Sequence, residues 1–385
     1  MISLCIPTKN AGPDFARYLT AWRQQKTEEE VELVVVDSGS RDSTVETARQ
    51  LGARVLAIPP EEFNHGETRN LLAREARGDL LVFTVQDACP AAETVLAELA
   101  RPLRSQPELA AVTGEQVPHA HADAVARWEV AAHNAIIAAG PPLKRFAGSS
   151  PLAGDFHERL RNVAFDNVCS ALRRSVWEKF PFARVEFAED LDWAVRVLCA
   201  GHVLLRNPAA RVHHSHNSAP YQRMKRAFVS RRALNRIFEM PSPETPWKEK
   251  EVLSEIGAYL GLLEGARRGL AREAEPVRRL RLVTTPGHWV RRALRRARLD
   301  GFEPLMIALP HQPVTDALAG AFNAALRHLL NFHGGLPRAE VEKAALQLGL
   351  QVLGDFLADS YTTAAAASQL PDWLKELADA LARNV

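Results

Sequence analysis

A short apolar run that ends in a single carboxylate is the feature of this sequence that most restricts its fold. Residues 78–90 begin with a Gly-Asp pair, continue through Leu80 to Val85, and reach Asp87. A continuous apolar run between turn residues predicts a strand buried on both faces. Ligands of open α/β sheets bind beyond the carboxyl ends of such strands, and a buried charge needs a partner. We therefore expect Asp87 either to bind a divalent cation that carries a diphosphate or to cap a helix starting near Ala91.

Strand-like and helix-like segments alternate through the first part of the chain. Strands are expected at residues 2–6, 31–36, 54–58 and 80–85, with helices between them at residues 14–25, 44–51 and 66–76. Further strands are expected at residues 109–117, 165–174 and 201–205, and further helices at residues 128–138 and 189–200. This alternation predicts an α/β fold, in which a mostly parallel sheet carries helices on both faces.

Polar residues follow three of the expected strands. They are Thr8 to Asn10 after the first strand, Asp37 to Ser40 after the second, and Asp87 after the fourth. Right-handed crossovers put the carboxyl ends of parallel strands on one edge of the sheet, so these groups should converge. Neither a G-x-G-x-x-G nor a Walker A pattern occurs, which argues against a dinucleotide oxidoreductase and a P-loop enzyme. The pattern favours a different kind of nucleotide crevice.

The composition excludes other classes of protein. The chain has 385 residues, 46% of them hydrophobic, and a net charge of only +2, which argues against general nucleic-acid binding. Its four cysteines have no metal-ligand spacing and are expected to be reduced thiols of a cytosolic protein. No run reaches the ~18 apolar residues of a membrane span. The N-terminus leads directly into a strand, so no signal peptide is expected.

Four motifs in the first 90 residues resemble family 2 glycosyltransferases. They are Pro7-Thr8-Lys9-Asn10, the segment 34–42 (VVVDSGSRD), the segment 63–70 (FNHGETRN) and Gln86-Asp87-Ala88-Cys89-Pro90. The last two motifs are closest to the rhamnosyltransferase-like branch, and the resemblance covers residues 1–238. It implies a GT-A fold and the transfer of a sugar, with inversion of the anomeric centre, from a nucleoside diphosphate to a hydroxyl group. The branch suggests dTDP-rhamnose as donor and a glycan or lipid-linked molecule as acceptor.

The resemblance also implies which residues bind the nucleotide. Asp37 would hydrogen-bond a pyrimidine base, and Thr8 would line the base and ribose. Arg69, with His65 nearby, would face the base or the diphosphate, because a guanidinium group suits phosphate oxygens. The remaining members of the expected nucleotide-binding set are Pro7, Asn10, Ser38, Ser40 and Gln86.

A metal site is implied by the same resemblance. Asp87 matches the second acid of the family's Asp-x-Asp motif, whereas Val85 occupies the place of the first acid. In the extended segment 212–216, the side chains of His214 and His216 should point to one side. One of them would complete the site with Asp87 and two donor phosphates, and Mn²⁺ or Mg²⁺ suits such ligands. The alternative is a surface loop whose histidines have no common role.

Acidic residues at positions 189, 190 and 192 begin the next expected helix. Carboxylates in a first helical turn are favoured by the helix dipole, which is the purely structural explanation. Inverting transfer also needs a carboxylate that removes the proton of the acceptor hydroxyl. The resemblance puts this role on Asp190 and lets Glu189 orient the site. Asn167 and Trp193 are expected to contact the acceptor.

The alternation of strands and helices stops after the breaker-rich segment 240–246. We therefore expect a GT-A nucleotide-sugar domain at residues 1–240 and a helical region at residues 241–385 that serves the acceptor, homo-oligomerisation or a membrane surface. Arginine recurs from residue 267 to residue 298, which suits either anionic lipid headgroups or a solvated helix face. The protein is expected in the cytoplasm, and contact with lipid would place it peripherally at the inner face of the membrane.

Three functions are open at this point. The leading hypothesis is a metal-dependent inverting glycosyltransferase of the hexosyltransferase class that acts in cell-surface polysaccharide biosynthesis. A nucleotidyltransferase shares the sheet and a metal-binding acid, but its Gly-rich, basic N-terminal loop is missing. A catalytically decayed glycan-binding or scaffold protein is suggested by Val85, whereas the Glu189-Asp190 pair and His214 argue against it.

Overall fold

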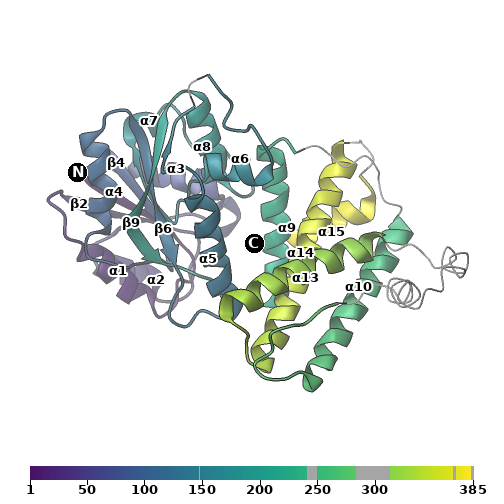
Figure 1. Ribbon diagram of the computed structural model, residues 1–385. Helices are drawn as coiled ribbons and strands as arrows, with labels where there is room; N and C mark the ends of the chain where they lie inside the picture. Colours follow the sequence, from purple (N-terminus) through teal and green to yellow (C-terminus); the bar gives the residue numbers. More distant parts are fainter. Residues whose placement is uncertain (147, 241–248, 283–312, 367–369, 383–385) are drawn as a thin grey trace, which may run out of the picture. The chain divides into compact units, whose positions relative to one another are not determined.

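The computed structural model describes residues 1–146, 148–240, 249–282, 313–366 and 370–382 (Figure 1). It divides into two compact units, residues 1–122 with 129–216 and residues 123–128 with 217–385. The segment 241–248, next to the predicted domain boundary, lies outside the described residues, so that boundary stays a prediction. Contacts place the helix at residues 220–237 in the second unit.

The first unit is built around a nine-stranded sheet with the order β3-β2-β1-β4-β8-β6-β9-β5, and β7 pairs with β9. β1, β2, β3, β4, β6 and β9 run in one direction, and β5, β7 and β8 run in the other. The expected mostly parallel sheet is thus confirmed. The strands are β1 (Ile2–Thr8), β2 (Val31–Asp37), β3 (Arg54–Ala57), β4 (Leu80–Thr84), β5 (Cys89–Pro90), β6 (Leu109–Val117), β7 (Leu143–Lys144), β8 (Cys169–Arg173) and β9 (Val203–His213).

Helices cover both faces of this sheet, as expected. On one face, Leu4 of β1 and Val82 of β4 share a buried core with Leu19 and Leu99 from two helices. On the other face, Phe83 packs edge-on against Phe182 at 5.4 Å between ring centroids. The helices of this unit are α1 (Phe15–Arg23), α2 (Thr44–Gln50), α3 (His65–Glu75), α4 (Val95–Ser105), α5 (Ala124–Ala138, begun in the second unit), α6 (Phe156–Val163), α7 (Arg174–Trp177), α8 (Glu189–Cys199) and the 3₁₀ turn η1 (Pro60–Glu62).

Two sequence expectations about local structure were wrong. The helix after Asp87 begins at Val95 with Thr94 as its N-cap residue, because residues 89–90 form β5 instead. Asp87 therefore caps no helix at Ala91. The strand expected at residues 201–205 begins at residue 203 and continues to residue 213, since β9 pairs with β6 and then with β5.

The second unit is helical in the part that the structure describes. Its helices are α9 (Pro220–Ile237), α10 (Glu249–Gly269), the 3₁₀ turn η2 (Leu270–Arg272), α13 (Pro313–His333), α14 (Arg338–Ala366) and α15 (Asp372–Ala382). Residues 283–312 of the expected helical region lie outside the described residues. α9 is joined to α14 by an ion pair between Arg231 and Asp359 at 2.8 Å, and Asn235 donates to the same carboxylate at 2.7 Å.

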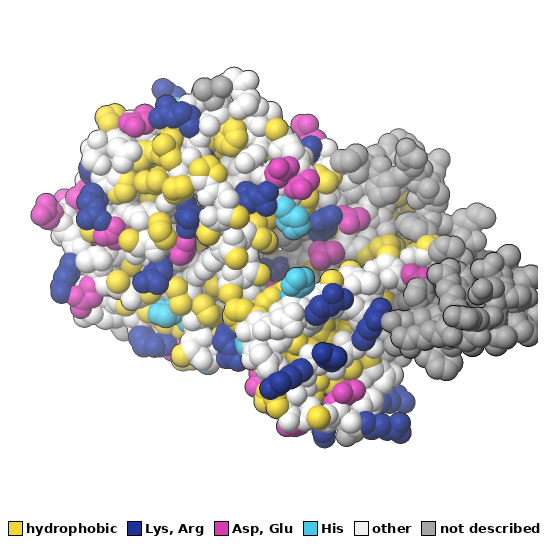
Figure 2. All heavy atoms as spheres, viewed as in Figure 1, with side chains coloured by type: hydrophobic (Ala, Val, Ile, Leu, Met, Phe, Trp, Pro, Cys, Tyr) yellow, Lys and Arg dark blue, Asp and Glu magenta, His cyan; other side chains and the backbone are white. Residues whose placement is uncertain are grey.

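Part of the expected arginine-rich segment can be followed in the second unit. Figure 2 shows Lys and Arg side chains along the surface that carries α10 and the residues after it. Exposed arginines in this stretch are Arg268, Arg272, Arg278, Arg279 and Arg281. Among the described residues, no helix combines the length and the apolar character needed to cross a membrane.

Candidate active site

The polar loops after β1, β2 and β4 meet at one edge of the sheet, as the sequence predicts. The backbone N–H of Lys9 donates to Gln86 Oε1 at 2.7 Å, and Gln86 Nε2 donates back to the Lys9 carbonyl at 3.2 Å. The N–H of Asn10 donates to Ser40 Oγ at 2.7 Å. Thr8 Oγ1 donates to an Asp37 carboxylate oxygen at 3.1 Å. These hydrogen bonds join three separate loops into one surface.

Asp37 lies inside this surface and is only 3% exposed. Its Oδ1 accepts from the N–H groups of Gly39 and Ser40 at 3.1 and 2.8 Å, and its Oδ2 accepts from Thr8 and from the Ser40 hydroxyl. A carboxylate has about four lone-pair sites, so the loop uses all of them. Asp37 thus shapes the loop, and its contact with a pyrimidine base stays a prediction.

Asp87, His214 and His216 form a group whose ligand atoms all lie within 4.8 Å of one another. The carboxylate is 3.6 Å from His214 Nε2 and 3.5 Å from His216 Nδ1. Atoms that share an ion at about 2.0–2.6 Å each lie about 3–4 Å apart, so these distances suit a divalent cation. Pairing of Cys89 with His213 between β5 and β9 brings the two segments together. His214 and His216 thus point to one side, as expected, and their role as ligands stays a prediction.

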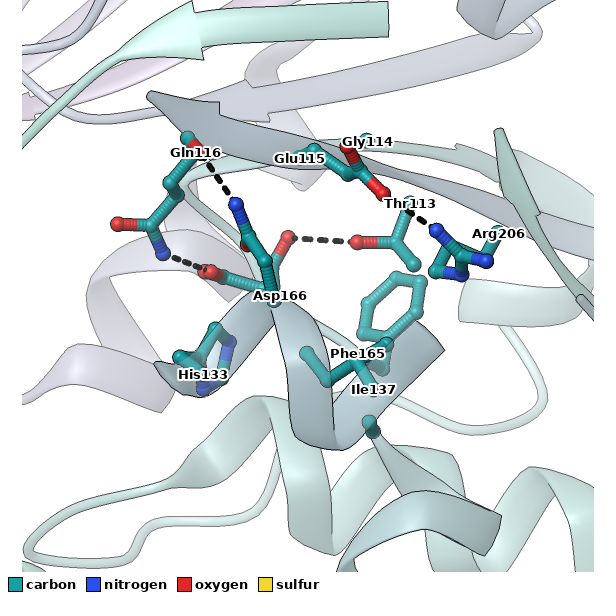
Figure 3. Close-up of a pocket in the computed structure, with 11 residues that line it drawn as sticks. Thr113, Gly114, Glu115, Gln116, His133, Ile137, Phe165, Asp166 and Arg206 are labelled. Carbon is teal, nitrogen blue, oxygen red and sulfur yellow. Dashed lines mark hydrogen bonds and ion pairs between the residues drawn. The ribbon is translucent and has the colours of Figure 1, made fainter. Parts of the chain in front are cut away.

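Behind the metal-ligand group, a small pocket lies between β6, α5 and the segment before β8 (Figure 3). Gln116 and Asp166 face each other at one end of it, with Gln116 Nε2 donating to the Asp166 carboxylate. Gln116 Oε1 lies 2.7 Å from Nδ1 of His214. At the other end, Glu115 pairs with Arg206. Gln116 therefore connects the metal-ligand group to the pocket.

Glu189 and Asp190 open α8, and their surroundings differ. Glu189 pairs with Arg69 at 2.9 Å, and both side chains are 6% exposed. Burial alone would raise the pKa of Glu189, but the positive charge of Arg69, helped by His65 and Asn167, lowers it. For Asp190, burial, followed by the charges of Glu189 and Asp166, raises the pKa to about 8. Near neutral pH the two adjacent carboxylates therefore favour opposite states: Glu189 is ionised, whereas Asp190 tends to keep its proton.

The motif at residues 63–70 holds the segment that leads to this pair. Asn64 Oδ1 caps α3 by accepting from Gly66 and Glu67, and its Nδ2 donates to the carbonyl of Val185 at 2.7 Å. Gly66 permits close approach, since a Cβ there would lie 2.1 Å from the Ala183 carbonyl oxygen. Asn70 donates to the Phe182 carbonyl at 2.8 Å. The motif therefore fixes the chain just before Glu189.

Ala188 sets the final turn into α8. Its φ of +60° lies in the left-handed region, which a non-glycine residue occupies at some cost. Such conformations concentrate at functional sites. The turn places Glu189 and Asp190 in the first turn of the helix.

The two residues expected at the acceptor are buried. Trp193 is 0% exposed, donates to the Phe180 carbonyl at 2.7 Å and packs against Phe165 and Phe182. This burial corrects the expectation, because a fully enclosed indole in the core cannot contact an acceptor in this structure. Asn167 is buried beside the acids: its N–H donates to Asp190 at 3.2 Å and its side chain donates to Glu189 at 3.3 Å. Asn167 thus holds the acidic pair.

The structure also shows functional candidates that sequence reasoning missed. Gln116 and Asp166 lie between the metal-ligand group and the acidic pair. Gln116 follows the apolar part of β6, so it has the same sequence signal as Asp87, a polar residue after a buried strand. No comparable signal marks Asp166, whose partner is 50 residues away in the sequence.

Comparison with known proteins supports a specific family. The model described as Glycosyl transferase family 2 matches residues 3–129. The O-antigen chain rhamnosyltransferase RfbN of Salmonella typhimurium is 35% identical over 232 residues, which cover 59% of this chain and 70% of that protein. WbaN of Salmonella anatum, also an O-antigen chain rhamnosyltransferase, is 34% identical with the same coverage. Glucosyl-3-phosphoglycerate synthase from Mycobacterium tuberculosis aligns with a TM-score of 0.47 and 17% identity, over 64% of this chain and 83% of that one.

The family model and the two rhamnosyltransferase relatives define the class of protein. The chain belongs to glycosyltransferase family 2 and is a glycosyltransferase. Within the family it is a rhamnosyltransferase-like member, as its motifs at residues 63–70 and 86–90 suggested.

Proposed function

We propose that this glycosyltransferase uses a divalent cation to transfer rhamnose, with inversion, from dTDP-rhamnose to a hydroxyl group of a glycan or lipid-linked acceptor. The relatives are named for rhamnosyl transfer to O-antigen chains, which supports the sugar and the class of acceptor. One structural observation carries the proposal. A metal-ligand group and a half-buried acid of raised pKa lie at the carboxyl edge of the sheet and are connected through Gln116, Asp166 and Asn167.

Asp87, His214 and His216 would hold the cation, which we propose to be Mn²⁺ or Mg²⁺. One carboxylate and two imidazoles suit Mn²⁺ better than Mg²⁺, because Mg²⁺ prefers oxygen ligands throughout. When bound, the ion supplies positive charge that stabilises the leaving diphosphate. Val85 stands in the place of the first acid of the family's motif, and the pair of histidines would offer ligands in its stead.

Asp190 would act as general base. In its ionised form it removes the proton of the acceptor hydroxyl while the oxygen attacks the anomeric carbon and the diphosphate leaves on the opposite side. A raised pKa increases its basicity near neutral pH. Glu189 stays ionised against Arg69 and, with Asn167, holds Asp190 in place.

The joined loops would bind the nucleotide. Backbone groups and small polar side chains line this edge of the sheet, which suits a base and ribose. Arg69 Nε has no hydrogen-bond partner among the described residues, although it is buried. A buried donor without a partner is costly, so an acceptor on the donor nucleotide would satisfy it. The proposed binding set is Pro7, Thr8, Asn10, Asp37, Ser38, Ser40, His65, Arg69 and Gln86.

The helical second unit would serve the acceptor or the assembly of the protein. Its exposed arginines between residues 268 and 281 suit the phosphates of a lipid-linked acceptor or anionic headgroups at the inner face of the membrane. We therefore propose a peripheral, cytoplasmic enzyme with domains at residues 1–240 and 241–385.

A thermal-shift screen of nucleoside diphosphate sugars with Mn²⁺ or Mg²⁺ tests this function. A ligand that binds only the folded protein stabilises it by mass action, so the true donor should raise the melting temperature most. We expect dTDP-rhamnose with Mn²⁺ to give the largest shift, and mixing it with a lipid-linked glycan to release dTDP. A protein that no nucleotide sugar stabilises with either ion would contradict the proposal.

A further inference from the structure

Gln116 lies between the metal-ligand group and the loop that holds the acidic pair, which are far apart in the sequence. Its Oε1 is 2.7 Å from His214 Nδ1, and its Nε2 donates to Oδ2 of Asp166. Asp166 in turn accepts from the N–H of Val168 at 2.8 Å through Oδ1. The neighbouring N–H of Asn167 reaches the proposed base, Asp190. A single amide side chain is therefore in contact with both the proposed metal ligand His214 and the loop that holds the acids.

The orientation of this amide follows from hydrogen-bond chemistry. Both oxygens of Asp166 face N–H donors, which is the arrangement of an ionised carboxylate. An ionised carboxylate can only accept, so the NH₂ group of Gln116 must face it. The other end of the amide, the acceptor Oε1, must then face His214. The amide cannot flip without placing an oxygen against the Asp166 carboxylate.

This orientation fixes the tautomer of His214. Oε1 has no proton to give, so Nδ1 of His214 carries the hydrogen. In a neutral imidazole the other nitrogen, Nε2, then carries the lone pair. Nε2 is the atom that lies 3.6 Å from Asp87. We infer that Gln116 is a positioning residue that keeps His214 in the Nδ1–H tautomer, with its Nε2 lone pair directed to the cation.

The backbone around Gln116 is rigid enough for this task. Gln116 pairs with Val212 between β6 and β9, and its carbonyl accepts from Asn134 Nδ2 at 2.8 Å. Two residues earlier, Gly114 lets β6 approach β9 closely, since a Cβ would lie 2.2 Å from the Ala210 carbonyl oxygen. Partners that orient a metal-binding histidine change metal affinity by about 10–100-fold when removed.

The inference rests on the proposed metal site, and its test separates the two. Histidine ¹⁵N NMR of the metal-free protein reports the tautomer directly, with the His214 signals assigned by their loss in His214→Gln. We expect the Nδ1–H tautomer in the wild type and its loss in Gln116→Met, which has similar volume and no amide. A wild-type His214 in the Nε2–H tautomer would overturn the inference without any variant.

Calorimetry with Mn²⁺ gives the second readout. Gln116→Met should weaken Mn²⁺ binding by about 10–100-fold, whereas Asn134→Ala, which removes a hydrogen bond to the Gln116 carbonyl and leaves the side-chain amide in place, should weaken it far less. Equal Mn²⁺ affinity of Gln116→Met and the wild type would overturn the positioning role. A wild type that binds no Mn²⁺ would instead contradict the metal site of the proposed function, and the NMR result would still decide the tautomer.

Discussion

The metal-ligand group and the acidic pair occupy the same edge of the sheet but differ in how their charges are satisfied. Asp87 is 38% exposed, and its two histidine partners lie at distances longer than a hydrogen bond. Glu189, in contrast, is buried in contact with Arg69. The first group has ligand atoms ready for an ion, whereas the charge of Glu189 is already paired within the protein. This difference suggests that donor binding and proton removal can be disrupted separately.

The largest expected effect comes from removing the proposed base. Asp190→Asn should lower turnover by about 100-fold or more, the usual contribution of a general base, and leave donor affinity near that of the wild type. Initial rates and calorimetry measure the two quantities. Asp192→Asn in the same helical turn is a matched control, since Asp192 pairs with Arg196 instead. Wild-type turnover in Asp190→Asn would exclude that role.

On the other side of the comparison, Asp87→Ala should weaken nucleotide binding only when the cation is present. We expect a loss of about 100-fold, because removing a ligand should cost at least as much as removing a partner behind it. Calorimetry with dTDP, with and without Mn²⁺, measures this effect. Asp79→Asn, at the opposite end of β4, should behave as the wild type does. If the wild type bound dTDP equally well with and without Mn²⁺, the metal-ligand group would have no part in nucleotide binding.

Arg69→Met tests how much the buried ion pair between Arg69 and Glu189 contributes to the stability of the protein. Removing the partner of a buried charge destabilises a protein by about 3–5 kcal/mol, because Glu189 would be left without compensation. Urea unfolding should show this loss, and the double variant Arg69→Met/Glu189→Gln should recover much of it. A single variant as stable as the wild type would show that the pair contributes little.

A smaller effect concerns pH. The folded-state pKa of Asp190, about 8, lies above the ordinary value of 3.8, so between these values the folded protein holds a proton that the unfolded chain releases. The stability from this group is fully present below pH 3.8 and is lost as the pH rises towards 8. Asp190→Asn should therefore gain stability relative to the wild type between pH 5 and pH 8, measured by thermal unfolding. A difference that stays constant with pH would contradict the raised pKa.

The sequence predicted the metal-ligand group better than the surroundings of the acidic pair. The metal-ligand group was predictable because Asp87, His214 and His216 follow strands, and polar residues at strand ends converge by topology. The burial of Trp193 was not predictable, since it depends on a hydrogen bond to the Phe180 carbonyl and on packing against Phe182, both of which lie in a loop. The roles of Gln116 and Asp166 could not be predicted from the sequence for a similar reason. Their contact depends on how β6 lies beside β8, and a single sequence does not reveal that order.

The fold shows the same division between local and long-range information. Hydrophobic patterning predicted β6 at residues 109–117 with the bounds that the structure has. The length of β9 could not be predicted, because its second half pairs with β5 and includes polar residues such as Arg211. Patterning reports which residues are apolar, whereas strand ends depend on the partner strand.

A crystal structure with Mn²⁺ and dTDP, with the ion located by its anomalous scattering, tests the central claim most directly. We predict one Mn²⁺ in contact with the Asp87 carboxylate, Nε2 of His214, Nδ1 of His216 and the diphosphate. A bound dTDP with the ion away from these three side chains, or with no ion at all, would contradict the account.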